Sequence, residues 1–216
     1  MSVYTPLTLN EVQVFATPYG LEVIDLIPIQ GGIQNTNYFL VCNTGEHYVL
    51  TIFEDLDEQG AAELVPVLEH LGKSGLPVPV PLNYAGKAIH ILKNKPAQIA
   101  PRMRGKHPMP STVAQVQAIA IAQAQIHLAL QDFPLQRTED RNHDYWLHVA
   151  KELKPTLNPA DAILLSEVLG LYDALTSVYP NRPKGFIHAD LFRDNTLFVD
   201  NQLHGILDFY ELNKNK

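Results

Sequence analysis

Two stretches near the end of the chain decide its fold: Gly185-Phe186-Ile187-His188-Ala189-Asp190-Leu191-Phe192-Arg193-Asp194-Asn195 and Ile206-Leu207-Asp208-Phe209-Tyr210. Short apolar runs, which favour strands, flank the polar segment 188–195. An asparagine follows Asp190 by five residues, and a second aspartate, Asp208, ends a later apolar run. Acidic and amide side chains are thus concentrated between short predicted strands.

This spacing suits phosphoryl transfer. The reaction needs a carboxylate that orients the attacking hydroxyl and accepts its proton, together with oxygen ligands for Mg²⁺. We therefore predict Asp190 as the catalytic base and Asn195 and Asp208 as the metal ligands. His188 is predicted to support catalysis by bracing the loop. Asp190 and Asn195 alone would also fit an ordinary turn, so Asp208 at this spacing is what favours a site.

The first half of the chain predicts a sheet with few helices. Thr8 and Glu11 form a capping-box pattern before a helix over 9–17. The helix pattern of 57–74 is interrupted by Pro66, which should shift or kink it. The pair Gly31 and Gly32 separates two of the predicted strands. The predicted strands are 21–29, 37–43, 47–53, 88–92 and 97–101.

The second half is mostly helical. Residues 112–130 are rich in Ala, Ile, Val and Gln, without Gly or Pro, and predict a helix. The start Asn158-Pro159 predicts an N-cap followed by a helix to about 179. Further elements are expected at 142–153 (helix) and at 185–187, 196–199 and 203–207 (strands). The composition changes near 101–111, so we predict an α+β protein with a small lobe over 1–102 and a helical lobe over 103–216.

The composition limits the classes of function. Hydrophobic residues make up 46% of the 216 residues, which suffices for a packed core. The net charge of −7 argues against binding to nucleic acid or to an acidic membrane surface. The single cysteine, Cys42, excludes a disulfide within the chain, and its expected place is a half-buried strand. With neither a signal peptide nor a membrane-spanning run, the expected location is the cytoplasm.

Several strings resemble the bacterial homoserine kinases, a group within the aminoglycoside-phosphotransferase branch of the protein-kinase-like fold. They are spread over almost the whole chain, from about residue 20 to 210. Ala189, where protein kinases have arginine, favours this branch. The matching strings are Gly31-Gly32-Ile33-Gln34-Asn35-Thr36-Asn37-Tyr38-Phe39-Leu40, residues 48–54, residues 75–79, residues 188–195 and Leu207-Asp208-Phe209-Tyr210.

The resemblance implies a two-lobed kinase-like fold whose helical lobe is incomplete. It implies ATP as phosphate donor with Mg²⁺, and L-homoserine as the acceptor that becomes O-phospho-L-homoserine for threonine biosynthesis. The oligomeric state is left open. A kinase for another small alcohol or an aminoglycoside, or an inactive fragment, stays as the alternative. The nucleotide is expected under residues of the 31–37 loop: Gly31, Gly32, Asn35, Thr36 and Asn37.

Two features depart from the kinase pattern. Thr51 stands where protein kinases carry the third-strand lysine, and a threonine cannot supply that charge. The chain also ends eight residues after Asp208, whereas related kinases continue into further helices. We therefore expect the apolar faces of the helices at 112–130 and 160–179 to lack cover. Reduced stability and low activity of this form should follow.

Overall fold

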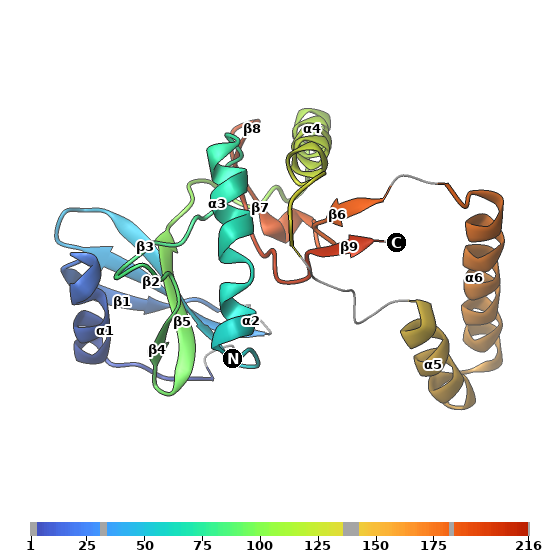
Figure 1. The fold of residues 1–216 in the computed structure, drawn as a ribbon, viewed down its shortest axis with the longest axis horizontal. Helices are drawn as coiled ribbons and strands as arrows, with labels where there is room; N and C mark the ends of the chain where they lie inside the picture. Colours follow the sequence, from blue (N-terminus) through green and yellow to red (C-terminus); the bar gives the residue numbers. More distant parts are fainter. Residues whose placement is uncertain (1–3, 31–33, 136–142, 182–183, 216) are drawn as a thin grey trace. The chain divides into compact units, whose positions relative to one another are not determined.

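The computed structural model describes residues 4–30, 34–135, 143–181 and 184–215 (Figure 1). The chain divides into two compact units, Met1–Phe133 with His188–Leu212 and Pro134–Ile187 with Asn213–Lys216. The first unit therefore joins the N-terminal sheet to the segment that carries Asp190 and Asp208. The division into lobes 1–102 and 103–216 stays a prediction, because these compact units follow spatial contacts rather than chain order.

A five-stranded antiparallel sheet, ordered β1-β2-β3-β5-β4, forms most of the first unit. Its hairpins follow from the turn residues: Gly45 has φ +81° between the second and third strands. Lys93 and Asn94 both have positive φ, so β4 and β5 meet in a tighter turn than the expected 93–96 loop. The strands are β1 (Val23–Pro28), β2 (Asn35–Cys42), β3 (His47–Phe53), β4 (His90–Leu92) and β5 (Lys95–Pro101).

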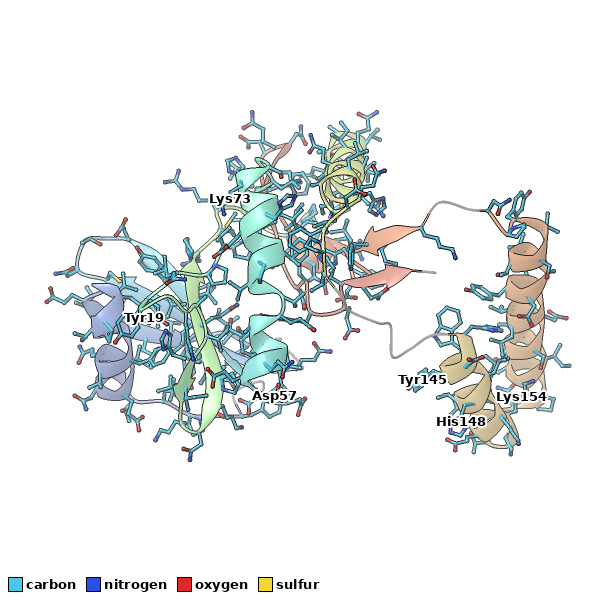
Figure 2. All side chains as sticks on the ribbon, viewed as in Figure 1. Tyr19, Asp57, Lys73, Tyr145, His148 and Lys154 are labelled. Atoms are coloured by element: carbon cyan, nitrogen blue, oxygen red, sulfur yellow. The ribbon has the colours of Figure 1, made fainter. Side chains whose placement is uncertain are left out.

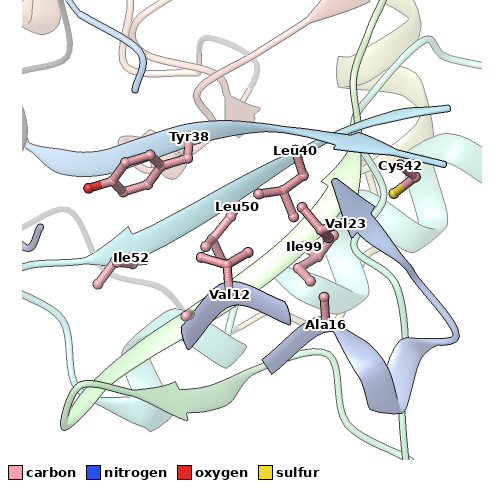
Figure 3. Packing of buried hydrophobic residues seen from close by; sticks show 10 residues of the cluster. Val12, Ala16, Val23, Tyr38, Leu40, Cys42, Leu50, Ile52 and Ile99 are labelled. Carbon is pink, nitrogen blue, oxygen red and sulfur yellow. The ribbon is translucent and has the colours of Figure 1, made fainter. Parts of the chain in front are cut away.

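The main core lies between this sheet and α1 (Leu9–Ala16), which is extended by the turn η1 (Thr17–Tyr19) (Figure 3). Alternate residues of β2 point into it, as the period of a strand requires. Cys42 is fully buried there rather than half-buried, and burial raises the pKa of its thiol. The other buried residues of this core include Val12, Ala16, Val23, Tyr38, Leu40, Leu50, Ile52 and Ile99.

The helix signals in the sequence are confirmed. Thr8 and Glu11 form the reciprocal capping box of α1. Asp57 caps α2 (Glu58–Ala62) by accepting a hydrogen bond from the Gly60 amide at 2.8 Å (Figure 2). Pro66 lies in the first turn of α3 (Val65–Lys73), so the single interrupted helix pattern becomes two helices.

The rest of the first unit holds α4 (Val113–Ala129), the turn η3 (Arg193–Asn195) and the hairpin β7 (Thr196–Val199) with β8 (Gln202–Ile206). Gln115 of α4 donates to the Asp200 carbonyl at 2.8 Å. The Ile206 amide donates to the Pro77 carbonyl at 2.8 Å. These bonds tie the β7–β8 hairpin to parts of the unit that are far away in sequence. The strand end that carries Asp208 is thereby fixed.

The second unit contains α5 (His143–Leu153), η2 (Lys154–Thr156), α6 (Pro159–Val178) and a strand pair, β6 (Gly185–Ile187) with β9 (Asn213–Asn215). The tail strand β9 was not expected from its polar sequence. Asn158 caps α6 as predicted. No residue of α6 is buried. Its exposed large apolar side chains are Ile163, Leu164, Val168, Leu171, Leu175 and Val178.

Candidate active site

His188 joins the polar loop to the strand end that carries Asp208. Its Nε2 lies 2.8 Å from the Leu207 carbonyl, which can only accept, so Nε2 bears a hydrogen. Its Nδ1 accepts from the Asp190 amide at 3.3 Å. The ring is buried against Phe209, and burial lowers its pKa. A neutral His188 therefore holds the 188–195 loop against the strand end that carries Asp208, as expected of a brace.

Asn195 fixes the Asp190 side chain. Its Nδ2 donates to Asp190 Oδ2 at 2.9 Å and to the Asp190 carbonyl at 2.7 Å. The Leu207 amide in turn donates to the Asn195 carbonyl at 2.8 Å. Oδ1 is the atom of Asn195 that can bind a cation, because the amide nitrogen only donates hydrogen bonds.

Asp208 is an incompletely satisfied carboxylate. Its Oδ1 is buried without a hydrogen-bond partner, and its backbone has φ +61°, a left-handed conformation that non-glycine residues seldom adopt. Burial is the largest cause that raises its pKa, and the charge of Asp190 raises it further. The Tyr210 amide donates to the carboxylate and opposes this shift. A cation beside Asp208 would offset the unfavourable charge.

The position of the missing third-strand lysine is filled by a hydrogen-bonded threonine. Thr51 donates to Asn37 Oδ1 at 2.7 Å, and it also bonds to the Tyr210 side chain. The ring of Tyr210 packs edge-on against Phe53 at 5.4 Å between centroids. Thr51 therefore connects the predicted nucleotide strand β2 to the Asp208-Phe209-Tyr210 segment. The sequence placed Tyr210 in a motif but did not indicate this contact.

Thr36 faces a second polar cluster. Its hydroxyl accepts from the Tyr4 and Thr5 amides and donates to Glu54 Oε1 at 2.5 Å. Glu54 also pairs with Lys95. Burial by itself would raise the pKa of Glu54, but the bonds from Lys95, Thr36 and Thr5 together hold it below its usual value. The Thr36 hydroxyl therefore accepts two hydrogen bonds and donates one within this cluster, a role that the sequence did not indicate.

Of the other residues predicted to contact the nucleotide, the structure describes Asn35 and Asn37 but not the two glycines. Asn35 begins β2 and is buried, and Asn37 follows it on the same face of the strand, toward Thr51. Gly31 and Gly32 lie outside the described residues. The structure thus brings together His188, Asp190, Asn195 and Asp208, and Thr51 links Asn37 to the same region. Roles in catalysis and nucleotide binding stay predictions for all of these residues.

Comparison with known proteins gives the family. Residues 25–213 match the phosphotransferase enzyme family. The chain is 37% identical over 213 residues to the homoserine kinase of Neisseria meningitidis serogroup B, covering 97% of this chain and 68% of that protein. It is 35% identical over 212 residues to the homoserine kinase of Pseudomonas aeruginosa, covering 97% of this chain and 67% of the relative. It thus spans about two thirds of the length of these relatives.

Solved structures agree on the fold. Spectinomycin phosphotransferase APH(9)-Ia, in complex with ADP and spectinomycin, superposes with a TM-score of 0.71 at 15% identity, covering 97% of this chain and 71% of that one. Aminoglycoside phosphotransferase APH(4)-Ia gives a TM-score of 0.68 at 20% identity, with 97% and 74% covered. The fold is the protein-kinase-like fold of the aminoglycoside phosphotransferases. By sequence and by fold, the chain belongs to the phosphotransferase enzyme family and, within it, to the homoserine kinases.

Proposed function

We propose that this chain transfers the γ-phosphoryl group of ATP to the side-chain hydroxyl of L-homoserine, giving O-phospho-L-homoserine and ADP. The observation that carries the proposal is the Asp190, Asn195 and Asp208 constellation in a chain whose curated relatives are homoserine kinases. The same relatives favour homoserine over an aminoglycoside, because the aminoglycoside enzymes match at only 15–20% identity.

In this proposal Asp190 orients the acceptor hydroxyl and takes its proton as the new O–P bond forms. The bond between the γ-phosphorus and the β,γ-bridging oxygen breaks, and ADP leaves with that oxygen. Asn195 holds the Asp190 carboxylate in one orientation through Nδ2. His188 holds the loop against the strand end, so the base and Asp208 keep their spacing.

The residues present fit a divalent cation. Asp208 supplies a buried carboxylate oxygen without a partner, and Asn195 supplies Oδ1. Over the described ranges, no group of three or more His, Cys, Asp or Glu side chains is placed to share a metal ion. One carboxylate and one amide suit Mg²⁺, which takes its other ligands from phosphates and water. When bound, Mg²⁺ would neutralise charge on the phosphates.

The experiment measures coupled ADP release with Mg·ATP across L-homoserine, L-serine, choline and an aminoglycoside. L-Homoserine should give the highest kcat/KM, and Asp190→Asn should serve as the inactive control. Equal turnover with all acceptors would contradict the substrate assignment. No helix among the described residues has the length and apolarity to cross a bilayer. The cytoplasmic location stays a prediction.

A further inference from the structure

The segment from His188 to Leu212 is strongly acidic. It contains five carboxylates and a single arginine or lysine, Arg193; the carboxylates belong to Asp190, Asp194, Asp200, Asp208 and Glu211. An acceptor with a carboxylate would therefore meet repulsion here unless a cation lies beside it.

Arg193 is the cation that the loop offers. Its side chain is exposed, and within the described ranges the guanidinium has no hydrogen-bond or ion-pair partner. Its backbone is fixed, because the Thr196 hydroxyl donates to the Arg193 carbonyl at 2.9 Å. An unpaired arginine next to several carboxylates is available for an incoming anion.

Phe192 lies between Asp190 and Arg193 and is 68% exposed. Its amide donates to the Asp190 carbonyl at 2.9 Å, and its own carbonyl accepts from the Asn195 amide at 3.1 Å. The loop therefore places the exposed ring two residues from the proposed base. An apolar ring fixed in this way gains stability when aliphatic carbons cover it.

We propose that Arg193 binds the carboxylate of the acceptor and that Phe192 packs against its methylene groups. The inference rests on the proposed function, because L-homoserine has a carboxylate separated from its hydroxyl by three carbon atoms. The loop would then select an amino-acid alcohol over a plain amino alcohol. Asp190 binds the hydroxyl end and Arg193 binds the carboxylate end, so both act on one small molecule.

The test compares L-homoserine with 3-amino-1-propanol, which is the same molecule without its carboxylate. Arg193→Ala should lower kcat/KM for L-homoserine by about 10- to 100-fold, the range for a charge-assisted pair. Its kcat/KM for 3-amino-1-propanol and its KM for ATP should stay close to the wild-type values. Arg193→Lys should recover part of the loss, because it keeps the charge without the planar fork.

Lys73→Ala is the matched control, since it removes an exposed positive charge at the end of α3 (Figure 2). Calorimetric binding of both alcohols with a non-hydrolysable ATP analogue provides a second readout that needs no turnover. If Arg193→Ala weakens both alcohols equally, or raises KM for ATP, the inference is wrong and the proposed function stands. If the wild-type chain neither binds nor phosphorylates L-homoserine, the proposed function fails and the inference fails with it.

Discussion

Replacing Asp208 by asparagine should stabilise the nucleotide-free protein while removing its magnesium-dependent binding of ATP. Oδ1 of the carboxylate is buried without a partner, and the pKa of the group is raised, first by burial and then by Asp190. Between the unfolded pKa of about 3.9 and the higher folded value, the native state binds more protons than the unfolded chain. Its contribution to stability therefore falls as the pH rises through this window. At neutral pH the ionised group is unfavourable, and asparagine removes its charge.

Asparagine keeps a polar atom at this position, so the expected gain is the cost of leaving the charge incompletely satisfied, about 1–3 kcal/mol. A change of 1 kcal/mol moves the melting temperature of a chain of this length by about 2–4 °C. Asp208→Asn should therefore melt about 2–12 °C above the wild type at pH 7.5 without ligands. The gap should shrink as the pH falls and the wild-type carboxylate gains its proton.

The assay is thermal unfolding at several pH values, with and without Mg·ATP. Asp55→Asn is the control, because it removes an exposed carboxylate without changing the site. Mg·ATP should raise the melting temperature of the wild type and of Asp55→Asn but not of Asp208→Asn. A lower melting temperature for Asp208→Asn at every pH would refute the reasoning, because the carboxylate would then be stabilising the fold.

Three further results are expected. Asp190→Asn should lower kcat by about 10²- to 10⁴-fold with ATP affinity retained, because general-base roles contribute that much; a parallel loss of affinity in calorimetry would indicate a structural role instead. Glu54→Gln should lower the free energy of unfolding in urea by about 1–3 kcal/mol at pH 7. The pKa of Glu54 is depressed, so its contribution to stability is present above the unfolded value of about 4.3 and is lost as the pH falls through the folded value. A stability difference that does not shrink as the pH falls would argue against the Lys95 pair. Leu171→Glu on α6 should reduce binding of a dye for apolar surface without lowering the melting temperature. A clear drop in the melting temperature would show that this face is covered.

Much of the local structure could be predicted because its causes are local. Thr8 with Glu11, and Asn158 before Pro159, signal helix starts through hydrogen bonds within one turn. Pro66 was predicted to shift or kink the 57–74 helix. Because proline lacks a backbone N–H, it is tolerated in a first turn, and α3 begins there as a separate helix. The polar tail strand β9 was not predictable, because it forms through pairing with β6 rather than through its own side chains.

The spacing of His188, Asp190, Asn195 and Asp208 predicted a site for phosphoryl transfer, and the resemblance indicated homoserine, both without a structure. The folded structure was needed to see how these groups are held. It showed that Asn195 uses its nitrogen on Asp190, that Asp208 keeps a buried oxygen without a partner, and that Thr51 joins Asn37 to Tyr210. Spacing along a chain fixes which groups are available. Burial and hydrogen-bond direction depend on segments that meet only when the chain folds.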